Sequence, residues 1–105
     1  MSNQNEFTIT KQSNPQGAKF EAVGFINMTT SLDLEKALEG ALQAGENDII
    51  LDMSKTQALT SFGIRVLLKT YKTALAKGGS FQIQSPSSVV ENVLKISNLD
   101  MLVKK

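Results

Sequence analysis

Apolar and polar residues alternate with two different periods along this chain, and the periods predict its secondary structure. Residues 7–10 and 18–26 alternate every second position, which is the spacing of half-exposed strands. Residues 14–17 lie between them, with proline second and glycine fourth, as in a β-turn. The chain is therefore expected to begin with a β-hairpin.

Two later segments repeat apolar residues every three or four positions, which is typical of one face of an α-helix. We expect Thr30 or Ser31 to cap the first helix and Gly45 to follow its end. Gly78 and Gly79 are expected to end the second. The two apolar faces consist of Leu34, Ala37, Leu38, Ala41 and Leu42, and of Ile64, Leu67, Leu68, Tyr71, Ala74 and Leu75.

The remaining segments complete an α/β pattern. Residues 48–52 are an apolar run typical of a buried parallel strand, residues 53–59 are expected to form a loop, and residues 81–84 alternate as a fourth strand. Ser85 and Pro86 fit the cap and first position of a third helix, and residues 99–103 fit a packed turn or short strand. The order ββαβαβα predicts one domain over residues 1–105, with a mixed, mostly parallel sheet of four to five strands.

Composition restricts the chemistry available to this domain. Its 105 residues include neither Cys nor His, which excludes disulfides, thiolate or imidazole metal sites and Ser-His-Asp triads. We expect no catalytic residue, metal or cofactor. Strictly apolar runs do not exceed three residues, whereas a membrane span needs about 20. The polar N-terminus does not resemble a signal peptide, so we expect a cytoplasmic protein with no membrane insertion.

Charge is distributed unevenly along the chain. Residues 53–90 contain five basic and no acidic residues, whereas residues 1–52 contain eight acidic and three basic ones. The simplest interpretation is a solvated helix face, and the alternative is a surface for a charged partner. Dispersed bases beside a single tyrosine do not indicate nucleic-acid binding. The five bases are Lys55, Arg65, Lys69, Lys72 and Lys77.

Three segments lie where a strand is expected to lead into a helix, which is where parallel sheets place ligands: residues 27–31, 53–63 and 84–87. They contain no phosphate-binding glycine loop. Asp33 and Asp52 could approach one another, but Asp52 is more simply interpreted as a loop anchor. These patterns argue against an enzyme. Phe25, Met28 and Phe62 are apolar residues in or near these segments.

Two hydroxyl residues, Thr60 and Ser61, precede the second predicted helix. One interpretation is that one of them is the N-cap, which is worth about 1 kcal/mol. The other is that one is a phosphoacceptor, since a phosphate there would meet the positive end of the helix dipole and add about −1.5 to −2 charges. The two interpretations are compatible.

Taken in order, these pieces resemble the STAS family, and within it the bacterial anti-sigma factor antagonists. Residues 24–27, Gly-Phe-Ile-Asn, resemble the family's Gly-x-Leu/Ile-Asp turn, and residues 49–54 resemble its central strand, which ends Asp-Leu-Ser. Residues 59–68 resemble the signature in which Asp-Ser-Ser/Thr-Gly precedes a Leu-rich helix. Thr60 and Asn27 stand where the family has aspartate.

The resemblance implies a phosphorylation-regulated interaction switch. In this family the dephosphorylated antagonist binds an anti-sigma factor that is also a serine-protein kinase, which frees a sigma factor, and a phosphatase resets the system. Ser61 is the implied phosphoacceptor, with Thr60 as the alternative. The implied partner-facing residues are Asn27, Met28, Thr29, Thr60, Ser61, Phe62, Gly63, Arg65 and Val66.

Two other functions stay open. The two replaced aspartates fit a STAS interaction subunit with no phosphorylation switch, in a signalling or lipid-transport assembly. The third possibility is a small-molecule or nucleotide-binding domain, or an enzyme that uses Asp33, Asp52 or Lys55.

Overall fold

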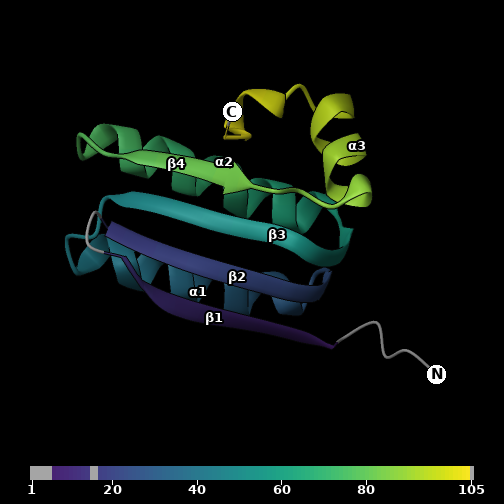
Figure 1. Cartoon of the computed structure of the whole chain (residues 1–105), viewed down its shortest axis with the longest axis horizontal. Coiled ribbons are helices and arrows are strands. Elements are labelled where there is room, and N and C mark those ends of the chain that lie inside the picture. Colours follow the sequence, from purple (N-terminus) through teal and green to yellow (C-terminus); the bar gives the residue numbers. More distant parts are fainter. Residues whose placement is uncertain (1–5, 15–16, 105) are drawn as a thin grey trace.

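The computed structural model, which describes residues 6–14 and 17–104, contains one mixed sheet in the order β1-β2-β3-β4 (Figure 1). Strands β1 (Phe7–Asn14) and β2 (Gly17–Ile26) are antiparallel. Strands β3 (Asp48–Leu59) and β4 (Ser80–Gln84) run parallel to β2. The predicted hairpin and mostly parallel sheet are confirmed, although the predicted turn includes Pro15 and Gln16, which lie outside the described residues.

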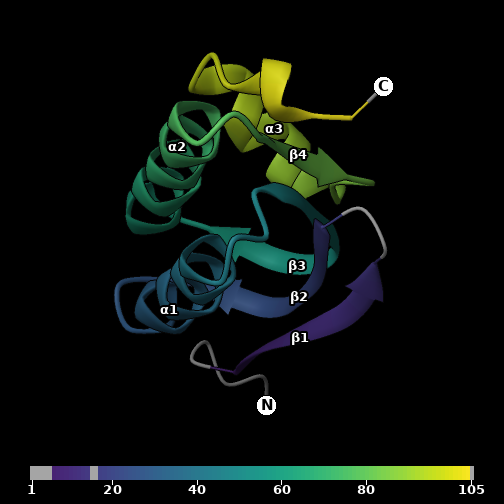
Figure 2. The same cartoon turned by 90° about the vertical axis from the view of Figure 1, so that its left-hand side faces the viewer.

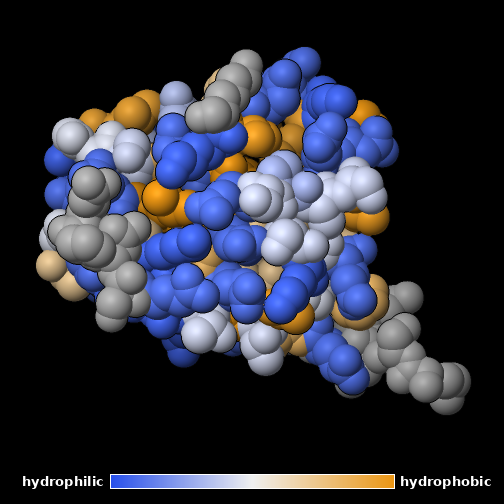
Figure 3. All heavy atoms as spheres, in the orientation of Figure 1, coloured by the Kyte–Doolittle hydropathy of each residue, from blue (hydrophilic) through white to orange (hydrophobic). Residues whose placement is uncertain are grey.

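Helices α1 (Thr30–Gln43) and α2 (Ser61–Ala76) lie side by side on one face of the sheet (Figures 1 and 2). The core forms between this face and the apolar stripes of the two helices, with Leu34, Leu51 and Leu67 fully buried. The opposite face of the sheet is mostly hydrophilic (Figure 3). The expected element order is confirmed, with four strands in the described part of the chain.

The prediction of a loop at residues 53–59 was wrong, because β3 continues to Leu59 and pairs with β2 along this length. Met53, Thr56 and Leu59 are buried, and the Thr56 hydroxyl donates a hydrogen bond to the Ala22 carbonyl at 2.8 Å. The register with β2 shifts twice along this half. Such irregularities break the two-residue alternation by which a strand is recognised in a sequence.

The third helix begins later than expected. Helix α3 (Ser88–Ile96) has Ser87 as its N-cap, and the Ser87 Oγ accepts a hydrogen bond from the Val90 N–H at 3.3 Å. Ser85 is in the left-handed region at φ 51°, so the prediction that Ser85 is the cap and Pro86 the first helical residue was wrong. The turn at Ser85 lets Ser87 bond to β3, with its N–H donating to Met53 O at 3.0 Å and its hydroxyl to Thr56 O at 2.7 Å.

The C-terminal segment combines both expected forms. A 3₁₀ turn, η1 (Asp100–Leu102), buries Leu102, and Val103 then forms a single parallel bridge to Ile83 of β4. The predicted ends of the first two helices are also confirmed. Gly45 and Gly78 follow the C-caps of α1 and α2 with φ of 86° and 79°, which glycine adopts without a steric penalty.

Two glycines should respond oppositely to alanine. A Cβ at Gly40, inside α1, would meet no atom within 4 Å, so Gly40→Ala should raise the free energy of unfolding by about 0.5–1 kcal/mol. A Cβ at Gly79 would lie 2.0 Å from the Asn47 carbonyl oxygen, which is itself held by the Ser80 N–H at 2.9 Å. Gly79→Ala should therefore lower stability by about 1–3 kcal/mol. Urea unfolding of both variants measures the difference, and equal effects would contradict this packing.

Candidate functional site

Two helix starts lie together at the carboxyl ends of β2 and β3. Ile26 pairs with Leu59 at the last position of both strands, so the chain leaves the sheet at adjacent points to enter α1 and α2. This pairing brings residues 27–29 next to residues 60–62. The exposed residues at these starts, which we call the helix-start surface, are Met28, Thr29, Leu32, Ser61, Phe62 and Arg65.

Asn27 organises the start of α1. Its side-chain Oδ1 accepts hydrogen bonds from the N–H groups of Thr29 at 2.9 Å and Thr30 at 3.0 Å. In return, the Asn27 N–H donates to Thr30 Oγ1 at 2.9 Å. The Ser31 N–H donates to the Asn27 carbonyl at 2.9 Å, so the first helical turn already begins at Asn27. This reciprocal arrangement is a capping box.

The prediction that Thr30 or Ser31 caps α1 was wrong in position. Both residues are buried inside the first turn rather than before it. The Thr30 hydroxyl donates to the Phe25 carbonyl at 2.6 Å, and the Ser31 hydroxyl donates to the Met28 carbonyl at 3.0 Å. Both hydroxyls therefore hold the turn between β2 and α1.

Thr60 occupies the N-cap position of α2, as one interpretation expected, but its hydroxyl forms no cap hydrogen bond. The Thr60 hydroxyl donates instead to the Ile26 carbonyl at 3.0 Å, and the Thr60 N–H donates to the same oxygen at 3.1 Å. These two bonds tie the start of α2 to the end of β2. An aspartate at this position could not donate the side-chain bond.

Ser61 is the first residue of α2 and is exposed. The described residues offer its hydroxyl no hydrogen-bond partner, and the first turn of α2 contains no acidic residue. Ser61 therefore presents a free hydroxyl beside N–H groups that lack an acceptor within the helix.

Two of the implied partner-facing residues lie below the surface. Gly63 and Val66 are both buried. A Cβ at Gly63 would lie 2.6 Å from both Ile26 Cγ2 and Leu59 Cδ1, so the absence of a side chain lets α2 approach the ends of β2 and β3. These two residues position the surface rather than form it.

The exposed part of the surface is largely apolar. Met28 is 62% exposed, Leu32 61% and Phe62 38%. Leu32 was not predicted to belong to this surface, although it lies two residues before Leu34 and therefore outside the apolar stripe of α1, which is a signal for exposure. The nearby Leu34, which is fully buried, takes the core position.

The other candidate segments do not join this surface. Strand β4 ends at Gln84 opposite Asp52, seven residues before Leu59, which is roughly 20 Å along β3 at about 3.3 Å per residue. Ser87 lies beside Thr56, to whose carbonyl its hydroxyl donates at 2.7 Å, and is thus still three residues of β3, roughly 10 Å, short of Leu59. Asp52 Oδ1 accepts the Ser54 N–H at 2.9 Å, in the anchoring role expected of it. Asp52 pairs with Glu21, five residues before the end of β2 at Ile26, whereas Asp33 lies in the first turn of α1 beyond that end, so the two carboxylates are not brought together.

In residues 6–14 and 17–104, no group of three or more Asp, Glu, His or Cys side chains is placed to hold a metal ion. None of the helices in this part of the chain is both long and apolar enough to cross a membrane.

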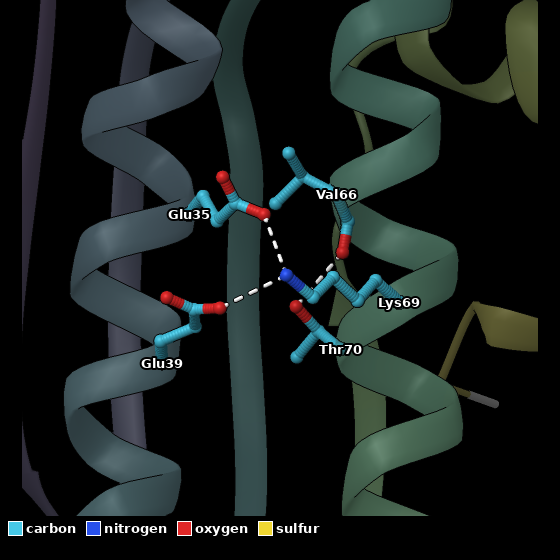
Figure 4. A network of polar contacts seen from close by, with 5 residues as sticks. All are labelled: Glu35, Glu39, Val66, Lys69 and Thr70. Carbon is cyan, nitrogen blue, oxygen red and sulfur yellow. Dashed lines mark hydrogen bonds and ion pairs between the residues drawn. The ribbon is translucent and has the colours of Figure 1, made fainter.

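The basic face of α2 meets the acidic face of α1. Lys69 Nζ lies 3.0 Å from Glu35 Oε2 and 3.0 Å from Glu39 Oε1 (Figure 4). Hydrogen bonds to Glu39 and then to Glu35 raise the pKa of Lys69 above its ordinary value of 10.5. Part of the charge asymmetry in the sequence is therefore used to hold the two helices together.

Comparison with known proteins identifies the family. The family model described as "Mlab, STAS domain" matches residues 9–104. The chain belongs to the STAS domain family. A relative from Thermotoga neapolitana, named "Putative anti-sigma factor antagonist TM1081 homolog", is 40% identical over 63 residues, which cover 60% of this chain and 56% of that protein. The STAS chain thus matches little more than half the length of this relative.

Solved structures of STAS proteins share the fold. An anti-sigma factor antagonist from Mycobacterium paratuberculosis superposes with a TM-score of 0.86 at 20% identity, covering 98% of this chain and 87% of the other. The unphosphorylated form of the anti-sigma factor antagonist SpoIIAA gives 0.82 at 16% identity, covering 92% and 86%. The phosphorylated form of SpoIIAA, a Bacillus cell fate determinant, gives 0.74 at 16%, covering 94% and 89%.

Removal of the Asn27 side chain should destabilise this STAS domain. Asn27→Ala leaves two N–H groups of the first turn without their acceptor and should cost about 1–2 kcal/mol of unfolding free energy. Asn27→Asp keeps the acceptor and should stay within about 0.5 kcal/mol of the wild type. Thr29→Ala is the matched control, because the Thr29 side chain forms no cap bond. Equal urea midpoints for the Asn27→Ala and Thr29→Ala variants would contradict the capping box.

Lys69 should contribute to stability only while it is protonated. Because its pKa is higher in the folded state, the contribution is present below pH 10.5 and is lost as pH rises through the folded-state value. As pH rises, the thermal unfolding temperature should therefore fall less for Lys69→Met than for the wild type. Added salt screens the ion pairs and should reduce this difference between the two proteins. Lys72→Met, which removes an exposed lysine of the same helix, is the control and should lose stability as the wild type does.

Proposed function

We propose that this STAS domain is an anti-sigma factor antagonist that docks through the helix-start surface and is released when Ser61 is phosphorylated. The observation that carries the proposal is the position of Ser61, which is exposed at the start of α2 on the same helix-start surface as the exposed Phe62, Met28 and Leu32. The names of the relatives, and the two forms in which SpoIIAA has been solved, support it.

Docking would bury the exposed apolar side chains of this surface. Aromatic and arginine residues supply much of the binding energy of protein interfaces, and Phe62 and Arg65 lie on the first two turns of α2. The proposed partner is an anti-sigma factor that is also a serine-protein kinase. Its capture by the STAS domain would free a sigma factor.

Phosphorylation would reverse this docking. The kinase would transfer the γ-phosphoryl group of ATP to Ser61 Oγ, with loss of the hydroxyl proton, and would release ADP. The product carries about −1.5 to −2 charges in the middle of an apolar surface, so renewed docking would require desolvation of that charge. A phosphatase would restore the hydroxyl by hydrolysis.

Ser61 fits the acceptor role better than Thr60. The Thr60 hydroxyl is half-buried and already donates to the Ile26 carbonyl at 3.0 Å, a bond that a phosphoryl group on Thr60 Oγ1 would abolish. Modification there would disturb the junction between β2 and α2 in addition to the surface.

A second function, a STAS interaction subunit of a signalling or lipid-transport assembly without a phosphorylation switch, is favoured by the residues around Ser61. Thr60 and Asn27 are uncharged where the family has aspartate, and both are engaged in local hydrogen bonds. Phe62 also stands where the family signature, Asp-Ser-Ser/Thr-Gly, has its second hydroxyl residue. In this case Phe62 would be a permanent apolar anchor for the partner.

Four variants should separate the two functions: Ser61→Asp, Ser61→Ala, Phe62→Ala and the control Ser88→Asp. Calorimetric titration with the host's anti-sigma factor kinase should show at least tenfold weaker binding for Ser61→Asp and wild-type binding for Ser61→Ala. Ser88→Asp is the control, because Ser88 is the exposed first residue of another helix, α3. It adds the same charge in the same helical position and should bind as the wild type does.

The pattern of results decides between the candidates. Wild-type affinity of Ser61→Asp, together with loss of binding in Phe62→Ala, would contradict the switch and support the constitutive subunit. Wild-type affinity of both variants would place the interface outside the helix-start surface. Mass spectrometry of protein from its host should locate a phosphate on Ser61 if the switch operates.

A further inference from the structure

The sheet has two edge strands, and the chain closes only one of them with described residues. At the β4 edge, the Lys104 N–H donates to the Ile83 carbonyl at 2.7 Å, next to the bridge between Val103 and Ile83. Beyond β1 no other described element lies in the plane of the sheet (Figure 1). Within residues 6–14 and 17–104, strand β1 is therefore the edge that no other segment of the chain covers.

The register of β1 shows which of its backbone groups face outward. The Phe25 N–H donates to the Glu6 carbonyl at 2.9 Å, so these opposed residues form a hydrogen-bonded pair of the antiparallel ladder. Such pairs recur at every second residue, which directs the N–H and C=O groups of Thr8 and Thr10 toward β2. The N–H and C=O groups of Phe7, Ile9 and Lys11 consequently point away from the sheet.

This edge has few of the features by which proteins prevent strand addition. The pairing of β1 with β2 runs over eight residues without a shift of register, and β1 contains no proline. Its only charged residue is Lys11, whose amine forms an ion pair with Glu46 of the same chain. Phe7 and Ile9 pack against the core but remain half-exposed at the margin.

We propose that β1 binds the β1 strand of a second copy of this chain, antiparallel and centred on Ile9, so that two sheets become one of eight strands. In this register Ile9 faces Ile9 of the other copy, and Phe7 faces Lys11 of the other copy. The outward N–H and C=O groups of these residues in the two copies then hydrogen-bond to one another. Thr8 faces Thr10 of the other copy on the opposite face of the sheet. No two like charges are opposed.

A second copy fits this edge better than an unrelated strand for two reasons. The paired positions are self-complementary, with Ile against Ile and Thr against Thr, which are favourable cross-strand pairs. Neutralisation of Lys11 by Glu46 also removes the repulsion that two copies would otherwise experience. Because the β1–β1 contact is isologous and occupies the β1 edge of both copies, addition at this edge ends at two copies and gives a two-fold dimer rather than a fibre.

The proposed dimer is independent of the proposed function. The helix-start surface lies at the carboxyl ends of β2 and β3, whereas the dimer uses the backbone of β1. A strand pair buries less area than a standard interface of about 1,600 Å² in total. We therefore expect a weak dimer that forms at high protein concentration.

Amide hydrogen exchange followed by NMR tests the outward groups directly. The amides of Thr8 and Thr10 should be protected at every concentration, because they bond to β2. The amides of Ile9 and Lys11 should exchange rapidly at about 20 μM and become protected toward about 1 mM, where a weak dimer is populated. Sedimentation equilibrium over the same range should show the mass rising from 11.4 kDa toward twice that value.

Charged variants on the exposed side of β1 test the register. The double variant Thr8→Lys, Thr10→Lys opposes like charges twice across the dimer axis and should raise the dimer dissociation constant at least tenfold. The double variant Thr8→Glu, Thr10→Lys opposes unlike charges at the same two positions and should dimerise at least as tightly as the wild type. Both pairs of side chains are exposed in a single copy, so circular dichroism should show the same fold for both.

Three results would overturn the proposal. One is a concentration-independent monomer over the whole range. Another is a dimer in which the amides of Ile9 and Lys11 stay unprotected, since the contact would then lie elsewhere. The last is equal dissociation constants for the two charged variants. Protection of these amides only after addition of a partner protein, with no change on concentration, would assign the edge to that partner instead.

Discussion

The parallel pairing of β2 with the second half of β3 is the constraint on which the rest of this STAS domain depends. It carries β3 seven residues beyond the end of β4, to Leu59 opposite Ile26. Both helices of the covering layer then begin at the same end of the sheet. If β3 ended at Asp52, the start of α2 would lie beside β4, and the surface that includes Met28 and Phe62 would not exist.

Polar groups at this surface are used mainly to hold its backbone. The side chains of Asn27 and Thr30 each accept a hydrogen bond from the other residue's backbone N–H. The Thr60 N–H and hydroxyl both donate to the Ile26 carbonyl oxygen. Among the described residues of this surface, the side-chain hydrogen-bonding groups that remain for a partner are the hydroxyls of Thr29 and Ser61 and the Arg65 guanidinium. Much of the exposed side-chain area at this surface is apolar and comes from Met28, Leu32 and Phe62.

The sequence predicted those elements whose periodicity is uninterrupted. Helices α1 and α2 show a regular stripe, and β1 and β2 alternate cleanly, so their existence and order could be predicted. The second half of β3 could not, because its irregular register with β2 places Met53, Thr56 and Leu59 inside at a spacing of three.

The helix caps were also hard to predict. The caps at Asn27 and Ser87 depend on where the preceding strand ends, and the sequence has several hydroxyl residues in a row near both positions. The placement of residues 27–29 and 60–62 on one surface followed from the resemblance, whereas the burial of Val66 required the packed structure.

The close approach at Gly63 has an evolutionary consequence. Because Ile26, Leu59 and Gly63 pack closely against one another, none of the three can be replaced by a larger residue unless another becomes smaller. An alanine at position 63 is compatible with this arrangement only when position 26 or 59 carries a smaller side chain, so substitutions at the three positions should covary among homologous sequences. Ile26, Leu59 and Gly63 should therefore change together in evolution, whereas the exposed Phe62 beside them can change with the partner.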